Sequence, residues 1–229
     1  MIIASLNLHA GYGADGMPFD VVTACRQLGA DLILLQEAWQ PAGRPDPAAQ
    51  AARALGAQLI RADLVARTSL SRLGIGADTS PGRWGLAVLT ALPVTGYEQV
   101  DLGRSPGDPI SRVAQLITVT TPAGDSLLVA NVHLTHLFFS PVQLMRLTRW
   151  LAMGSTAAVI AGDLNMPAPV TGLAVGYSPA VSGRTFPATR PLVQLDHVLA
   201  GRGVHACDGR VLPPVGSDHL PIRASLRAR

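Results

Sequence analysis

Eight short apolar segments with the composition of β-strands recur along the chain, and they limit the fold more than any other feature. They span residues 1–8, 31–38, 85–94, 112–121, 126–134, 157–164, 193–200 and 220–226. Between the fourth and fifth segments, Pro122 and Gly124 are typical of a hairpin turn. Because strands of this kind must bury an apolar face, we expect packed sheets covered by helices.

Three further segments, 18–30, 47–57 and 140–154, have the periodicity of amphipathic helices. The first of them ends at Gly29, a residue that commonly stops a helix. Residues 67–83 and 101–111 show neither the helical periodicity nor the apolar composition of a strand, and they are expected to be irregular. Many strands and few helices therefore predict an α+β fold.

The composition supports one folded domain that spans residues 1–229. With 48% hydrophobic and 14% charged residues, the chain can bury a large core and is not a disordered protein. The net charge of +3 allows an anionic ligand but does not require nucleic acid. All 18 basic side chains are arginines, which genomic base composition explains, although arginine also suits phosphate geometry.

Other features of the sequence bear on where in the cell the protein is found. No apolar run is long enough for a membrane span, and the first residues lack the pattern of a signal peptide. Cys25 and Cys207 lie far apart and form no metal-binding or redox motif, so we expect free thiols. These observations predict a cytoplasmic protein, and its oligomeric state stays open.

Polar side chains stand at the ends of several predicted strands. They are Asn7, Glu37, His133, Asp163, Asn165, Asp196, His197, Asp218 and His219. A single one would suit a hydrogen-bonded group at a sheet edge, but the recurrence of carboxylate, amide and imidazole groups indicates a functional site. Asp163 and Asn165 are two residues apart, so an extended chain would turn both side chains the same way.

The oxygen atoms of Asn7, Glu37 and Asp218 suit a hard cation such as Mg²⁺ or Mn²⁺. A zinc site is less favoured, because no cysteine joins the group and the histidines have aspartate neighbours. The other polar residues are candidates for activating water and for stabilising a phosphoryl transition state. These candidates are His133, Asp163, Asn165, Asp196 and His219.

The motifs LQE, NVHL, GDLN and SDHLP occur in this order, and together they resemble the endonuclease/exonuclease/phosphatase superfamily of DNase I-like metal-dependent phosphoesterases. The resemblance covers nearly the whole chain. It implies a four-layer sandwich, with two mostly antiparallel sheets face to face and helices outside. It also implies hydrolysis of a phosphate ester by activated water, with Mg²⁺ or Mn²⁺ and no covalent intermediate.

The resemblance implies a role for each matching residue near the metal. Glu37 matches the principal metal ligand of the family. Asn7 matches an asparagine that helps to bind metal and phosphate, and Asp218 matches a further carboxylate on the metal side.

The remaining matches concern the reaction itself. Asp163 matches the residue that orients or deprotonates the attacking water, and Asn165 matches an amide that contacts the scissile phosphate. His219 matches a histidine that donates to a phosphate oxygen, and Asp196 matches the aspartate that orients it. His133 matches a histidine on the opposite side of the phosphate.

Some positions depart from the family pattern or leave alternatives. His9 stands where several nuclease branches have an aspartate, which puts a second metal in doubt; this residue either contacts substrate or is structural. Arg112 either lies near phosphate, as in relatives, or faces solvent at a strand edge. Arg184 and Arg190 are candidate substrate contacts on a loop that borders the site in relatives.

The substrate class stays open between several alternatives. A small-molecule or lipid-head-group phosphodiester is favoured, because the insertions with which nucleases grip DNA are not evident. A nuclease acting on DNA or RNA is the alternative, so nucleic acid is a possible but not favoured partner. A binding protein that has lost catalysis is a rival, although the complete motif set argues against it. Phe138 and Phe139 either form an apolar lip for a lipid tail or pack against the following helix.

Overall fold

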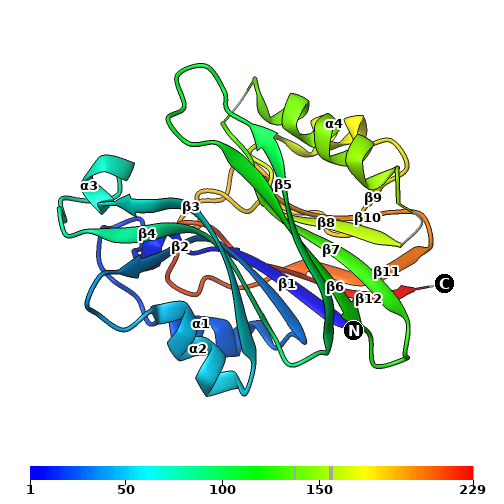
Figure 1. Ribbon diagram of the computed structural model, residues 1–229, viewed down its shortest axis with the longest axis horizontal. Helices are drawn as coiled ribbons and strands as arrows, with labels where there is room; N and C mark the ends of the chain where they lie inside the picture. Colours follow the sequence, from blue (N-terminus) through cyan, green and yellow to red (C-terminus); the bar gives the residue numbers. More distant parts are fainter. Residues whose placement is uncertain (137, 155–156, 229) are drawn as a thin grey trace.

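Two six-stranded sheets form the framework of the computed structural model, which describes residues 1–136, 138–154 and 157–228 (Figure 1). The first sheet has the order β11-β12-β1-β2-β4-β3 and the second β5-β6-β7-β8-β10-β9. The first sheet contains β1 (Ile2–Asn7), β2 (Leu32–Pro41), β3 (Gln58–Thr68), β4 (Gly82–Thr90), β11 (Val204–Val211) and β12 (Ile222–Ala228). The second contains β5 (Val94–Gly103), β6 (Arg112–Thr120), β7 (Ser126–His133), β8 (Ala158–Asp163), β9 (Ser178–Pro179) and β10 (Asp196–Ala200).

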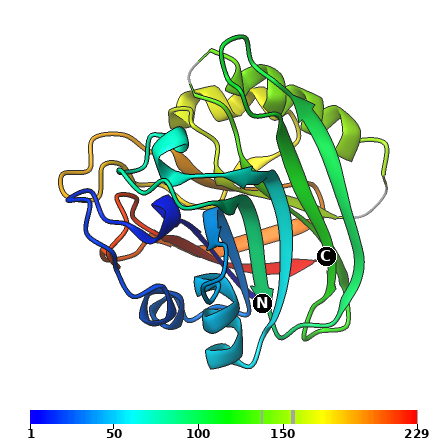
Figure 2. The same ribbon diagram turned by 60° about the vertical axis from the view of Figure 1, so that its left-hand side comes forward.

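Helices cover the outer faces of both sheets. They are α1 (Val21–Leu28) and α2 (Pro47–Leu55) on the first sheet and α4 (Ser140–Leu151) on the second. The short helix α3 (Leu70–Leu73) and the 3₁₀ turns η1 (His9–Gly11) and η2 (Ala168–Leu173) lie in connecting segments. Figure 2 shows α1 and α2 on one side of the paired sheets and α4 on the other. The predicted four-layer sandwich is therefore confirmed.

Alternation along the strands explains the layers. In β1, Ile3 packs between the two sheets, whereas its neighbour Ala4 packs beneath α1 and α2. In β7, Val129 lies in the core between the sheets and Ala130 faces α4. Each central strand is thus apolar on both faces, which is why these strands read as continuous apolar runs in the sequence.

The eight predicted strands and three predicted helices are all present. The strands that the sequence did not predict, β3, β5, β9 and β11, are short or partly exposed, so their composition is less apolar. Helix α1 ends as predicted, because Gly29 adopts a left-handed conformation with φ of 55°. The predicted irregular segment 67–83 contains the short helix α3.

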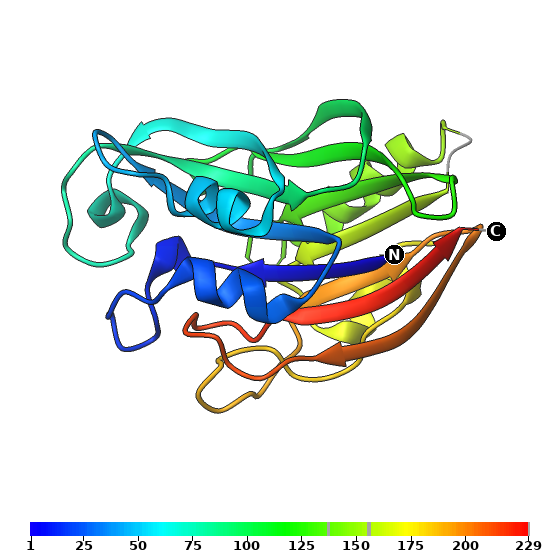
Figure 3. The same cartoon turned by 90° about the horizontal axis from the view of Figure 1, so that it is seen from below.

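Two parallel strand pairs decide where the polar strand ends meet. Strand β1 pairs with β2 in parallel, and β7 pairs with β8 in parallel, while the other strand pairs are antiparallel. Strand β1 ends at Asn7, β7 at His133 and β8 at Asp163, as predicted. The prediction that Glu37 ends its strand is wrong: β2 continues past it to Pro41, because pairing with β4 resumes after a bulge. Each sheet therefore places two of the predicted site residues on neighbouring parallel strands, and Figure 3 shows the paired sheets from below.

A fully buried group of polar side chains joins the sheets just behind this edge. The Asn131 amide oxygen accepts a hydrogen bond of 2.8 Å from Gln36, and its nitrogen donates to Gln115 at 3.0 Å and to the Ala87 carbonyl at 3.1 Å. Gln36 also contacts Ser5 through its oxygen and its nitrogen. Asn131 and Gln115 come from the second sheet and the others from the first, so this network ties the sheets together.

The two ends of the described chain also meet, since the Met1 amino group donates to the Leu226 carbonyl. Of the helices in the described residues, none has the length and apolar character needed to cross a membrane.

We predict that Asn131→Leu lowers the free energy of unfolding by about 2–4 kcal/mol, because it leaves Gln36 and Gln115 buried without their partner. Chemical denaturation measures this change. Gln27→Leu, at an exposed position of α1, is the matched control and should change stability little. Equal stability of the two variants would contradict the role assigned to the network.

Candidate active site

The Asn7 side chain connects the two sheets at the site. Its amide nitrogen donates to Glu37 Oε1 at 3.1 Å and to Asp163 Oδ2 at 3.0 Å. Its amide oxygen accepts from the His9 backbone N–H at 2.9 Å, which fixes the orientation of the amide. Two carboxylates from different sheets are thereby held on either side of one amide group.

Glu37 reaches the site because β2 is distorted at this residue. The pairing between β2 and β4 shifts register between Leu35 and Ala38, and Glu37 has a left-handed φ of 51°. Such a bulge turns a side chain away from the direction that strand alternation would give it. Burial raises the pKa of Glu37, although the Asn7 amide and the His9 imidazole oppose that shift. Positive φ at a non-glycine residue is a strain that often accompanies function.

Asp163 and Asn165 come together by a route that the sequence did not predict. Strand β8 ends at Asp163, and Asn165 is left-handed with φ of 50°, so the prediction of two side chains on one extended face is wrong. Instead Asp163 Oδ1 accepts from the Asn165 backbone N–H at 2.9 Å, which closes an Asx turn. The Asn165 amide nitrogen donates to the Leu134 carbonyl at 2.9 Å. Burial raises the pKa of Asp163 to about 7.

The glycine that precedes Asp163 allows a close approach of two strands. A Cβ atom on Gly162 would lie 2.0 Å from the Val132 carbonyl oxygen, and the residue has φ of 140°. Strands β7 and β8 can therefore approach closely only with glycine at this position, and this places His133 beside Asp163.

His219 and Asp196 form a buried pair. Nδ1 of His219 lies 2.9 Å from Asp196 Oδ2, and its other ring nitrogen, Nε2, lies 3.8 Å from Asp163 Oδ2. Burial disfavours the charged ring, but Asp196 and Asp163 outweigh this and raise the pKa of His219 to about 10. The ring of Phe186 covers His219 at 4.7 Å between centroids. The geometry suits an imidazolium that points into the site.

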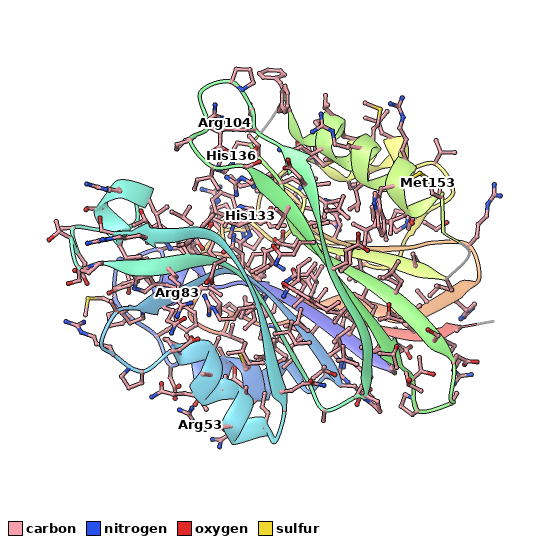
Figure 4. The ribbon with its side chains drawn as sticks, viewed as in Figure 1. Arg53, Arg83, Arg104, His133, His136 and Met153 are labelled. Carbon is pink, nitrogen blue, oxygen red and sulfur yellow. The ribbon has the colours of Figure 1, made fainter. Side chains whose placement is uncertain are left out.

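His133 approaches the same carboxylates from β7. Its Nε2 lies 3.7 Å from Asp163 Oδ2 and 3.9 Å from Glu37 Oε1, and its ring lies 5.7 Å from that of Trp84. Burial, together with the nearby Arg112, lowers the pKa of His133 well below its usual value. Figure 4 shows His133 in the middle of the molecule. The two histidines therefore differ, with His219 charged and His133 neutral near pH 7.

Asp218 lies at the more open side of the site. Its neighbour Ser217 donates to the Asn7 carbonyl at 2.6 Å, which attaches the loop before β12 to the end of β1. Asp218 Oδ1 lies 3.8 Å from His9 Nδ1. The same nitrogen of His9 also lies 3.1 Å from the Tyr12 carbonyl. His9 therefore contacts the site through Asp218 and also stabilises the turn that contains it.

The three candidate arginines occupy different positions. Arg112 is only 6% exposed, so it does not face solvent; it pairs with Asp108 at 3.1 Å and lies 5.6 Å from the Trp84 ring centroid. Arg184 and Arg190 are exposed. Their loop does border the site, because Phe186 covers His219 and the Ala188 N–H donates to the Asp218 carbonyl.

The donor set fits a divalent cation. The four carboxylates of the site have only imidazoles as ion-pair partners among the described residues. Ligand atoms of Asp163, Asp196 and His219 lie within 4.8 Å of one another, so these residues form one group that could hold a metal ion. Because Asp196 and His219 are already hydrogen-bonded to each other, the oxygens of Asn7, Glu37 and Asp218 are the alternative, and they suit a hard cation.

Several residues that support the site were not predicted. Gln36 and Asn131 each precede a site residue on a buried strand, and a polar residue in such a run is the signal that could have revealed them. Thr185, whose hydroxyl oxygen accepts from the Asp196 backbone N–H at 3.2 Å, had no comparable signal. Trp39 and Trp84 are buried, as expected of core residues.

Two facing sheets and a carboxylate and imidazole site at their shared edge define a DNase I-like phosphoesterase fold. The sequence profile described as the Endonuclease/Exonuclease/phosphatase family matches residues 4–219. The chain belongs to this family and is an endonuclease/exonuclease/phosphatase-family phosphoesterase.

Solved structures of low sequence identity share the fold. An endonuclease/exonuclease/phosphatase from Beutenbergia cavernae has 21% identity and a TM-score of 0.76, over 100% of this chain and 71% of the other. A mannosyl-6-phosphatase from Bacteroides thetaiotaomicron has 14% identity and a TM-score of 0.75, over 99% of both chains. The human Nocturnin catalytic domain, with a bound sulfate anion, has 16% identity and a TM-score of 0.75, over 100% and 93%. A comparison with curated proteins finds no match.

We predict that Asp196→Asn moves the alkaline limb of the pH–rate profile to lower pH. The wild-type His219 keeps its proton up to a pKa of about 10, and loss of the Asp196 charge lets the proton leave at lower pH. The kcat should fall on the order of 10²–10⁴-fold. Asp125→Asn, in the exposed hairpin turn, is the control.

The double variant Asp196→Asn/His219→Ala should be little slower than His219→Ala alone, because the two residues act as a unit. Additive losses would show that Asp196 acts elsewhere.

Proposed function

We propose that this protein hydrolyses phosphodiesters with Mg²⁺ or Mn²⁺, and that its substrate is a small molecule or a lipid head group rather than nucleic acid. The observation that carries the proposal is the meeting of Asn7 and Glu37 from one sheet with Asp163 from the other. Two histidines of different charge flank this centre. Such a set can position water on one side of a phosphate and a cationic donor on the other.

Asn7, Glu37 and Asp218 are the residues proposed to hold the metal. When bound, the ion would polarise the phosphate and neutralise part of its charge. The burial that raises the pKa of Glu37 also makes an uncompensated carboxylate unfavourable there, so a cation would stabilise the charged site.

Asp163 is the proposed base, because its pKa of about 7 lets it take a proton from water near neutral pH. His219 would donate from Nε2 to a phosphate oxygen, with Asp196 holding the opposite ring nitrogen. His133, which is neutral, would donate a hydrogen bond from the β7 side. Asn165 would orient Asp163 through its backbone N–H in the Asx turn.

The substrate assignment has separate support. One protein of similar fold is a mannosyl-6-phosphatase, and another, the Nocturnin catalytic domain, holds a sulfate anion. Both facts suit a phosphate-ester substrate. Phe138, in the link between β7 and α4, is 92% exposed and would suit an apolar substrate tail. A nuclease is the second candidate. Loss of catalysis is disfavoured, because each carboxylate of the site lies within 4 Å of an imidazole nitrogen.

Glu37→Gln should lower kcat/KM in saturating Mg²⁺ on the order of 10³-fold, because it removes a charge that holds the metal. Isothermal titration of Mg²⁺ should show weakened binding, and thermal unfolding should stay cooperative. The control is Glu98→Gln, at the exposed second glutamate of the chain. Activity close to that of the wild type would refute the role of Glu37.

The substrate class can be tested with purified protein and Mg²⁺ on bis(p-nitrophenyl) phosphate, p-nitrophenyl phosphate, sphingomyelin and plasmid DNA. We expect turnover of a non-nucleic diester, and binding to duplex DNA that is weak and changes little with salt, unlike the steep salt dependence of many phosphate contacts. Efficient plasmid nicking at low enzyme concentration would establish the nuclease alternative instead.

A further inference from the structure

A group of arginines lies beyond the end of the site on the first sheet. A cavity of about 430 Å³ is lined by Arg44, Arg67 and Arg83, which come from the β2–α2 link, the end of β3 and the start of β4. A second cavity, of about 370 Å³, shares Arg67 with the first and adds Arg72. Neither lining includes a carboxylate.

Most of this positive charge is free to bind a ligand. Within the described part of the chain, Arg44, Arg67 and Arg72 form no ion pair, and all three are exposed. Arg83 pairs with Asp63 at 3.2 Å but half of its side chain is exposed. Asp63 is shared with Arg61, so it neutralises Arg83 only in part. Asp78 is close enough to Arg44 for the arginine charge to contribute to lowering the pKa of this carboxyl group.

The first cavity lies near the active site, because two of its lining residues follow Glu37 on the same strand. Arg83 lies opposite Gln40 in the β2–β4 pairing, and Gln40 and Pro41 line the first cavity. These residues follow Glu37 by three and four positions, which places the cavity about 10–13 Å from it. Figure 4 shows Arg83 on the first sheet, apart from His133.

A third hollow adjoins the first cavity. It has a volume of about 250 Å³, shares Pro41 and Arg44 with the first cavity, and is lined by Tyr12 and Trp39 and also by the carboxylates Asp20 and Asp78. The Tyr12 carbonyl contacts His9, and His9 lies 3.8 Å from Asp218. The wall of this hollow is thus in contact with the Asp218 side of the site through His9, and an extended substrate of about 10–13 Å would span the distance along β2 from Glu37 to the arginines.

We infer that Arg44, Arg67 and Arg83 form a subsite for a second phosphate group of the substrate, separate from the phosphate that reacts. This inference rests on the proposed phosphodiesterase function and narrows it to substrates with two or more phosphates along an extended molecule. Arginine suits this role because its planar guanidinium binds phosphate oxygens in pairs.

The test compares a substrate that has one phosphate with one that has several. Bis(p-nitrophenyl) phosphate is the first. The second is 5′-phosphorylated trithymidylate, which serves as an extended probe with three phosphates and is not the proposed natural substrate. For the variant Arg44→Ala/Arg67→Ala/Arg83→Ala, the KM for the trinucleotide should rise on the order of tenfold, with kcat nearly constant. The KM for bis(p-nitrophenyl) phosphate should not change. An unchanged KM for the trinucleotide, or an equal rise for both substrates, overturns the inference.

The matched control variant is Arg53→Ala/Arg202→Ala/Arg227→Ala. It removes the same charge from three exposed positions that do not line these cavities. It should leave both KM values near those of the wild type, and an equal effect in the control would mean that only net charge matters and would overturn the subsite. If the triple variant does not fold, Arg67→Glu alone should raise the KM for the trinucleotide selectively.

A binding measurement without metal separates this inference from the proposed function. Fluorescence anisotropy of labelled trithymidylate in EDTA should show that the triple variant has a shallower salt dependence, by about 2 in the log–log slope for three arginines. Inorganic tripolyphosphate should compete with the trinucleotide in the wild type, and failure to compete overturns the subsite. If the wild type hydrolyses neither substrate, the proposed function fails, while this binding measurement still decides the inference.

Discussion

The structure depends on the hydrogen bonds that hold one sheet against the other at the polar edge. Asn7 bonds to Glu37 of its own sheet and to Asp163 of the facing sheet, and Asn131 bonds to Gln36 and Gln115 just behind them. The hydrophobic effect between the sheets is non-directional, whereas a hydrogen bond requires a defined distance and angle between its donor and acceptor. The amides therefore fix the relative position of two half-sites that the apolar core alone would leave less well defined.

Burial of so many ionisable groups has opposite effects on groups that lie a few ångströms apart. It raises the pKa values of Glu37 and Asp163 and lowers that of His133, because burial disfavours every charged form. The pKa of His219 is raised instead of lowered, because the carboxylates of Asp196 and Asp163 face its ring. Burial thus yields a carboxylate that can accept a proton near neutral pH, and the carboxylates that face His219 yield an imidazolium that can donate one. The strained backbones of Glu37 and Asn165 are the structural cost of this arrangement.

Much of the fold could be predicted, because the central strands are buried on both faces and their apolar runs are unmistakable. The edge strands β3, β5 and β11 could not, since a half-exposed strand has a mixed composition that resembles a loop. Among the site candidates, four at the ends of central strands come together: Asn7, His133, Asp163 and Asp196. Glu37 joins them from a bulge within β2 rather than from a strand end. Arg184 and Arg190 lie on an exposed loop, where sequence alone says little about side-chain direction.

By itself, the sequence determined the strand pattern, the family motifs and the chemical types at the strand ends, because these depend on local composition and order. Only the tertiary structure decided that Glu37 turns inward at a bulge and that Asp163 holds Asn165 through an Asx turn. It also decided that Arg112 is buried against Trp84, and that Arg44, Arg67 and Arg83 share one cavity. Each of these depends on the pairing register and on neighbours from distant segments, and a one-residue shift in register would turn the side chains to the other face.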